Sequence, residues 1–158
     1  MKLKNIFFWI LPALIFIQFG AAAAQKPHMA SAIDFTLPSL EGKQYTLSQF
    51  KGKNPVLLVF FATWCPPCRR EIPQLIDYQD RYASKGLKVM AINIDEAPDE
   101  VRTFAKGHGI NYTVLLDEGA QVADKYSIRN IPTNILINKK GEVNFIGHTL
   151  PKNIEDVL

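Results

Sequence analysis

Hydrophobic and polar positions divide the chain into two kinds of segment. Continuous runs of apolar and β-branched residues, such as "PVLLVFFAT" at 55–63, are typical of strands buried on both faces. Segments with apolar residues at three- and four-residue spacings lie between them and predict helices. The predicted strands cover residues 55–63, 87–95, 111–117, 134–138 and 142–148. The predicted helices cover the stretch that ends near Gly86, residues 98–109, the short segment 119–128, and residues 151–158.

The order of these segments predicts the fold class. Strands alternate with helices up to residue 128, and the last two strands flank "KKG" at 139–141, which is typical of a hairpin turn. This alternation, followed by a hairpin, predicts an α/β protein with one central mixed β-sheet flanked by helices.

The first 24 residues have the pattern of an export signal. A basic start precedes an apolar run at 6–19, and the alanines that follow offer small residues for cleavage before Gln25. A permanent membrane anchor is the alternative, but it would need roughly 20 apolar residues. The run here is shorter and contains Pro12. We therefore expect residues 1–24 to be a signal peptide and the protein to be exported, in the periplasm or another extracytoplasmic space.

Removal of this signal leaves 134 of the 158 residues, enough for one domain with its own core. We expect residues 25–32 to be a linker and residues 33–158 to form that domain. The net charge falls from +3 to +1, because two lysines leave with the signal. So small a charge provides no basic field for nucleic acid.

Two cysteines, Cys65 and Cys68, stand in the sequence "WCPPC". A structural disulfide across a two-residue gap would close a very small loop and constrain the unfolded chain little. A zinc site needs about four ligands, and His28, His108 and His148 have no matching spacing. We expect no metal, and we interpret the pair as a redox-active dithiol.

The pattern places Cys65 at the carboxyl end of a central strand and at the start of a helix, where open α/β sheets carry their sites. The helix dipole and unpaired N–H groups favour a thiolate there, which lowers the pKa of the thiol. Since the thiolate is the nucleophile in disulfide exchange, we expect an exposed Cys65 to attack. Cys68, one turn into the helix and buried, would resolve the mixed disulfide.

The residues next to the cysteines affect the thiolate. Pro66 suits the first helical position, whose N–H has no partner in any case. Pro67 removes a further amide that could solvate the Cys65 thiolate, so the reduced form is less favoured and the pair should be a better electron donor. Arg69 and Arg70 add positive potential, although a solvated helix surface explains them more simply.

The sequence also resembles a known family. "WCPPC" with Pro73 five residues after Cys68, "YSIRNIPTNILINKKGEV" at 126–143 and "FIGHTLPKNIEDVL" at 145–158 resemble the thioredoxin fold. The N-terminal extension "DFTLPSLEGKQYTLSQFKGK" at 34–53 and the strand–helix insert before "IPT" are similar to the exported TlpA/ResA-type branch. The resemblance covers about residues 33–158.

The resemblance implies roles for three further residues, Pro132, Ile131 and Glu71. Pro132 matches the cis-proline of the family, beside the cysteine pair. The backbone of Ile131 would pair with an incoming peptide. Glu71 matches an acid of the TlpA/ResA-type proteins, and its spacing puts it on the face of the helix that carries Cys68, where it could exchange protons with the dithiol. Trp64 would shield the pair and offer an aromatic contact surface.

One position departs from the family pattern. Many thioredoxins carry a buried aspartate six residues before the first cysteine, where this chain has Val59. Glu71 is the obvious substitute for that acid. Asp95 and Asp117 are weaker candidates, because capping or turn chemistry explains acids at strand ends.

We therefore expect an exported thiol–disulfide oxidoreductase that reduces disulfides in partner proteins without a bound cofactor. The resemblance implies apocytochrome c among the substrates and a membrane thiol donor that reduces the pair again. If the signal stays uncleaved, it would tether the protein to the membrane.

Three alternatives remain open at this point. A peroxidase of the peroxiredoxin type needs Pro-x-x-x-Thr-x-x-Cys, which "LVFFATWC" at 58–65 lacks. A disulfide-forming oxidase would keep the cysteines, although Pro67 argues against it. A non-enzymatic copper(I) module would use the same thiolates, but such modules usually add a nearby Met or His, and the mature chain has only Met29 and Met90.

Overall fold

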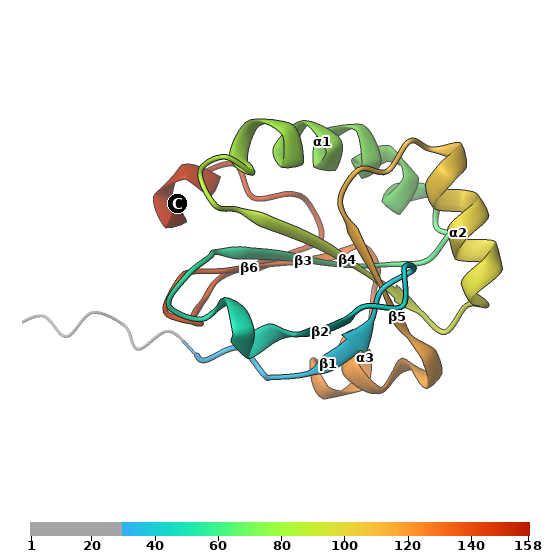
Figure 1. Cartoon of the computed structure of the whole chain (residues 1–158), viewed down its shortest axis with the longest axis horizontal. Helices are drawn as coiled ribbons and strands as arrows, with labels where there is room; N and C mark the ends of the chain where they lie inside the picture. Colours follow the sequence, from blue (N-terminus) through green and yellow to red (C-terminus); the bar gives the residue numbers. More distant parts are fainter. Residues whose placement is uncertain (1–29) are drawn as a thin grey trace, which may run out of the picture.

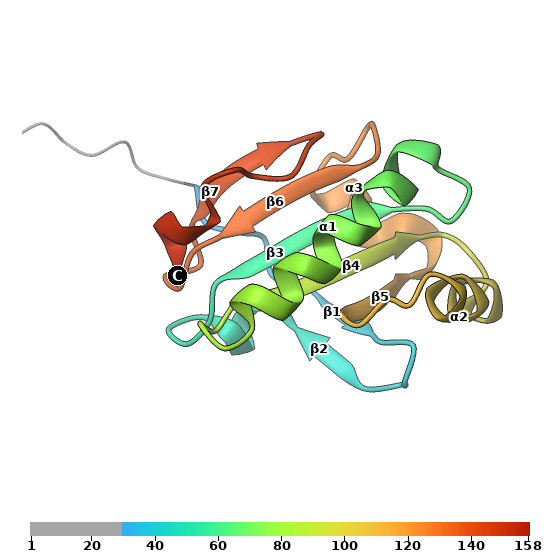
Figure 2. The same ribbon diagram turned by 90° about the horizontal axis from the view of Figure 1, so that it is seen from above.

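The computed structural model describes residues 30–158, so the expected signal peptide at 1–24 and most of the linker lie outside the described residues. The centre of the fold is a five-stranded mixed sheet (Figure 1), and its strand order, β5-β4-β3-β6-β7, can be followed in Figure 2. Its strands are β3 (Val56–Phe61), β4 (Lys88–Ile94), β5 (Thr113–Asp117), β6 (Thr133–Ile137) and β7 (Val143–Gly147). β3, β4 and β5 are parallel, whereas β6 and β7 run antiparallel to their neighbours.

The side chains of β3 pack against layers on both faces of the sheet. Alternate side chains of a strand point to opposite faces. Leu57, Val59 and Phe61 pack in one core cluster, with α1 (Pro66–Tyr82) and α2 (Pro98–Gly107). The intervening apolar residues of β3 pack in a second cluster, with α3 (Gln121–Lys125) and the N-terminal extension. Figure 1 shows these layers above and below the sheet, and Figure 2, seen from above, shows α1 lying across the strands. The predicted fold class is confirmed.

The N-terminal extension forms an element that the hydrophobic pattern did not define. It folds as the hairpin β1 (Thr36–Pro38) and β2 (Gln44–Thr46), followed by the 3-10 turn η1 (Leu47–Phe50). The hairpin attaches to the main sheet through a bridge between Ser39 and Leu115 of β5. It thereby covers the face of the sheet opposite α1.

Two predicted segments differ in the structure. The first helix ends at Tyr82 rather than near Gly86, and the chain then turns through Gly86, whose φ of 97° suits glycine. The helix expected over 151–158 is wrong, because the chain forms only the 3-10 turn η3 (Ile154–Val157) there. Ile154 and Val157 are buried, and their three-residue spacing matches the 3-10 period.

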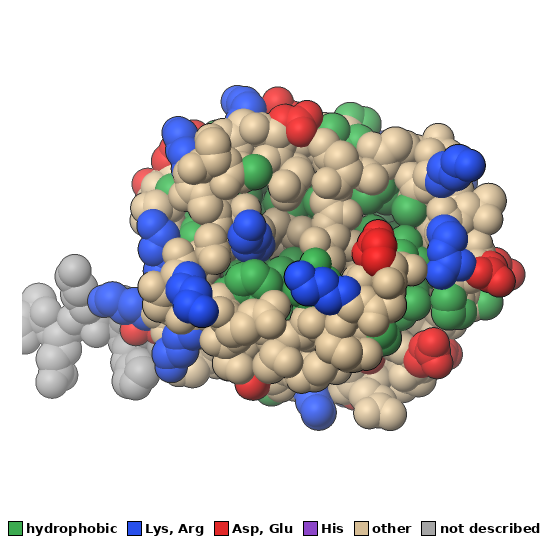
Figure 3. Space-filling view, in the orientation of Figure 1, with side chains coloured by type: hydrophobic (Ala, Val, Ile, Leu, Met, Phe, Trp, Pro, Cys, Tyr) green, Lys and Arg blue, Asp and Glu red, His purple; other side chains and the backbone are tan. Residues whose placement is uncertain are grey.

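The described chain begins at one end of the sheet, and Cys65 lies at the other. Val143 donates to the carbonyl oxygen of Ala30 (2.8 Å), and Ala32 donates to that of Gly141 (2.9 Å). This is the end at which β3 starts, whereas Cys65 follows the end of β3. Figure 3 shows acidic and basic side chains interspersed on one face. Within residues 30–158, no helix is long and apolar enough to cross a membrane.

Candidate active site

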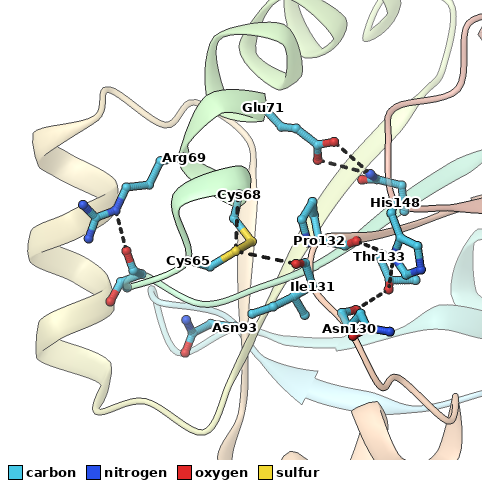
Figure 4. Close-up of a disulfide and its surroundings, with 12 residues drawn as sticks. Cys65, Cys68, Arg69, Glu71, Asn93, Asn130, Ile131, Pro132, Thr133 and His148 are labelled. Carbon is cyan, nitrogen blue, oxygen red and sulfur yellow. Dashed lines mark hydrogen bonds between the residues drawn. A yellow bond between two sulfur atoms is a disulfide. The ribbon is translucent and has the colours of Figure 1, made fainter.

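Cys65 and Cys68 form a disulfide at the junction of β3 and α1 (Figure 4). Cys65 is the N-cap of α1, and its sulfur accepts a hydrogen bond from the backbone N–H of Cys68 at 3.3 Å. Pro66 and Pro67 have no N–H, so Cys68 supplies the first amide of the helix that reaches this sulfur. The local geometry therefore agrees with the limited solvation of the thiolate inferred from the two prolines.

The expected exposure of Cys65 is wrong. Cys65 is only 2% exposed, hardly different from Cys68 at 4%, whereas the neighbouring Trp64 is 66% exposed. Cys65 packs in the core cluster beneath α1, and the carbonyl oxygen of Ile131, in the neighbouring loop, lies 3.8 Å from its sulfur. A partner that reaches the pair must therefore approach between Trp64 and this loop.

The loop over the disulfide is fixed by several hydrogen bonds. The bond between Ile131 and Pro132 is cis, as expected. Thr133 Oγ1 donates to the carbonyl oxygen of Asn130 at 2.6 Å. His148 Nδ1 lies 2.9 Å from the carbonyl oxygen of Pro132 and, since a carbonyl only accepts, this nitrogen carries the proton. From the sequence, His148 was of interest only as a possible metal ligand, and nothing there indicated this contact.

Glu71 lies in α1, three residues after Cys68, and both project from the same side of the helix (Figure 4). The carboxylate accepts hydrogen bonds from Asn134 Nδ2 at 3.1 and 3.3 Å. Burial raises the pKa of Glu71, and the hydrogen bond from Asn134 offsets part of that rise. A carboxyl group of this kind holds a proton to higher pH than a solvated one, as general acid–base chemistry near neutral pH requires. In the sequence, the only indication of this role for Asn134 was that it is a polar residue in an otherwise apolar stretch.

A second acid, Glu96, holds the loop before the cysteines. Its carboxylate accepts from the backbone N–H of Thr63 (2.7 Å), from the Thr63 hydroxyl and from Asn93 Nδ2 (2.6 Å). Arg69 Nε donates to the carbonyl oxygen of Thr63 at 2.7 Å, so this arginine does more than cover a solvated surface. Sequence reasoning missed Glu96, and its position just after β4 was the only available signal.

The other acids at strand ends serve the local fold. Asp117 accepts from the backbone N–H groups of Val122 and Ala123 at the start of α3, and Asp95 accepts from that of Gly119. The capping and turn interpretation of Asp95 and Asp117 is confirmed. Arg70 is exposed on α1.

Glu96→Ala should lower the free energy of unfolding by about 2 kcal/mol, because it leaves the donors of Thr63 and Asn93 without their charged acceptor. Urea unfolding of the oxidised protein measures this. Glu100→Ala is the matched control, since Glu100 is exposed on α2, and it should stay within about 0.5 kcal/mol of the parent protein. Equal losses in the two variants would show that Glu96 does not hold the loop.

A cysteine pair at the start of a helix, beneath a cis-proline loop on a mixed sheet, defines a thiol–disulfide oxidoreductase of the thioredoxin fold. The comparisons with known proteins agree with this class. The chain belongs to the AhpC/TSA family, whose profile matches residues 29–146.

Its relatives carry names of the same activity. The chain is 36% identical over 137 residues to the thiol-disulfide oxidoreductase ResA of Bacillus subtilis, which covers 85% of this chain and 76% of that protein. It is 32% identical over 169 aligned positions to the ResA of Bacillus cereus, with 100% and 97% covered. A solved thiol:disulfide interchange protein of Chlorobium tepidum superposes with a TM-score of 0.74 at 26% identity, covering 84% of this chain and 98% of that one.

Proposed function

We propose that this protein is an exported reductant of disulfides in partner proteins. The observation that carries the proposal is the Cys65–Cys68 pair at the N-terminus of α1, where Cys68 supplies the first backbone amide that reaches the Cys65 sulfur. Weak solvation of the thiolate disfavours the dithiol form relative to the disulfide, so electrons flow from the pair to a partner.

The reaction has two exchange steps. The Cys65 thiolate attacks one sulfur of the partner disulfide, which forms a mixed disulfide and releases the second partner sulfur as a thiolate. Cys68 then gives up its proton and its sulfur attacks Cys65, so that the Cys65–Cys68 disulfide forms and the remaining partner sulfur leaves. Two electrons pass to the partner. Glu71 is the group that accepts the Cys68 proton.

The contact surface for the partner surrounds the pair. Trp64 projects into solvent beside Cys65, and the Ile131–Pro132 loop lies on the other side of the sulfur. An extended peptide that enters here meets the backbone of Ile131 with its own backbone, and Trp64 with its side chains. Apocytochrome c is a candidate substrate, because the family resemblance implies it.

The arrangement of the domain suits export and membrane proximity. The described chain begins at the end of the sheet opposite the cysteine pair. A leader or an uncleaved anchor at residues 1–24 would therefore leave the redox end free to meet partners. A membrane thiol donor would return the disulfide to the dithiol after each cycle.

The reduction potential tests the direction of electron flow. We expect a value below about −220 mV, near or below the glutathione poise. The protein is equilibrated in glutathione buffers of defined ratio, and the reduced fraction is read by thiol trapping with a maleimide and mass spectrometry. A value near −120 mV, that of a strong oxidant, would reverse the proposal and make the protein a disulfide-forming oxidase.

A further inference from the structure

Asn134 is a polar residue buried in the middle of the main sheet. Its relative exposure is 0%, and its Oδ1 has no hydrogen-bond partner among the described residues. A buried amide in an apolar core destabilises the fold unless its polar atoms are paired. The other end of the same amide makes two contacts with one group, the carboxylate of Glu71, at 3.1 and 3.3 Å. Among the described residues, Glu71 is therefore the only side chain to which the amide of Asn134 is hydrogen-bonded.

The strand register explains how Asn134 reaches Glu71. Asn134 of β6 lies opposite Val59 of β3, and Val59 packs in the core cluster beneath α1. Asn134 thus projects to the face of the sheet that α1 covers. Val59 occupies the position at which the family pattern has a buried aspartate. In this chain the polar group near the cysteines stands on β6 rather than on β3, and it meets an acid carried by α1.

Among the described residues, no positive charge contributes to the pKa of Glu71. Two tyrosines lie close enough to respond to its carboxylate. Burial is the main cause of the raised pKa of Tyr112, and the charge of Glu71 raises it further. Burial is also the main cause of the raised pKa of Tyr78, to which Glu71 is a smaller contributor. Of the influences on Glu71 itself, burial opposes its ionisation and only the Asn134 amide favours it.

We propose that Asn134 is the positioning residue of the resolving step, and that its amide holds the Glu71 carboxylate where it accepts the proton of Cys68. This proposal rests on the proposed function of Glu71. In the step, the Cys68 S–H bond breaks and its proton passes to Glu71. The Cys68 sulfur attacks Cys65, the bond between Cys65 and the partner sulfur breaks, and the partner leaves with the electron pair. Glu71 then returns the proton to the departing thiolate or to water.

The test separates the two exchange steps with an aromatic disulfide, 5,5′-dithiobis(2-nitrobenzoate), as the probe. Each molecule of reduced full-length protein releases one coloured thiolate when Cys65 attacks and a second when Cys68 resolves. We expect Asn134→Leu, which keeps the number and branching of the side-chain heavy atoms and removes the amide, to slow the second release about tenfold at neutral pH and the first by less than twofold. Its rate–pH profile for the second release should also move to higher pH, because the acid has lost its donor.

A double-mutant cycle distinguishes this proposal from the role of Glu71. Glu71→Gln should slow the second release about a hundredfold, the scale of general base catalysis, and the double variant with Asn134→Leu should be no slower. If Glu71→Gln has no effect, the proposed function of Glu71 fails. If Glu71→Gln is slow but Asn134→Leu is not, or if their effects multiply, Asn134 does not act through Glu71 and the inference fails alone.

Two further variants guard against a loss of fold. Asn134→Asp is isosteric and places a second carboxylate against Glu71, so the profile should move to still higher pH than in Asn134→Leu. An unchanged profile in this variant would overturn the proposal even if Asn134→Leu did not fold. Asn144→Leu makes the same substitution at an exposed position of β7. It should leave both releases unchanged, and a slow second release there would assign the effect to general perturbation.

Discussion

Cys68→Ala should leave the protein covalently joined to its substrate, whereas Cys65→Ser should leave it unable to form any such complex. Attack by Cys65 yields a mixed disulfide that only a second thiol in reach can break. Without Cys68 that complex persists, and turnover stops in both variants. Each reduced variant is mixed with a protein substrate that has a single disulfide, and non-reducing electrophoresis with mass spectrometry of the trapped species would show the difference.

The reverse outcome is physically meaningful here, because Cys65 and Cys68 are almost equally buried, at 2% and 4% exposure. If Cys65→Ser trapped the substrate and Cys68→Ala did not, Cys68 would be the nucleophile and the order of the two steps would be inverted. Unfolding curves of the reduced variants serve as the control. Both variants lack the disulfide in either case, so they should unfold together with the reduced parent protein.

The parts of the fold that the sequence predicted are those with local causes. β3 appears as an unbroken apolar run because both of its faces are covered, and α1 shows the three- and four-residue spacing of its buried face. The cysteine pair and the cis-proline were also predictable, because each lies in a short local motif that matches the family pattern. The last segment was mistaken for a helix because two apolar residues three positions apart fit an α-helix almost as well as a 3-10 turn.

The parts that could not be predicted depend on contacts between distant segments. The sulfur of Cys65 contacts the carbonyl oxygen of Ile131, 66 positions further along the chain. Glu96, just after the end of β4, accepts hydrogen bonds from Thr63, and Asn134 of β6 donates to Glu71. Each of these residues is an ordinary polar residue in its local sequence. Only the strand order, which brings β3, β4 and β6 together, turns them into one site.

Glu71→Gln should lower the turnover of a protein disulfide about a hundredfold at neutral pH, because glutamine cannot accept the Cys68 proton. The rate of the parent protein should depend on pH in a defined direction. Burial raises the pKa of Glu71 above the ordinary carboxyl range, and the base is the ionised form. The rate of the parent protein should therefore rise as pH increases through this raised pKa, and that rise should be missing from the Glu71→Gln profile.

The stability of the same variant should change in the opposite direction to its activity. A carboxyl group whose pKa is higher in the folded than in the unfolded protein favours folding when protonated. That contribution is fully present below the unfolded pKa and is lost as pH rises through the folded one. Glutamine keeps an oxygen that accepts from Asn134 but never ionises. Glu71→Gln should therefore match the parent protein in acid and be the more stable of the two at neutral pH, as denaturant unfolding at both pH values would measure.

A slower and more stable variant would mean that the fold keeps a destabilising ionised acid beside Cys68 because the resolving step needs it. If Glu71→Gln were slower and also less stable at neutral pH, the carboxylate would support the packing of α1 on β6, and its loss would slow the enzyme indirectly. If the variant kept full activity, the Cys68 proton would pass to water or to the departing thiolate, and the burial of Glu71 would have no part in the reaction.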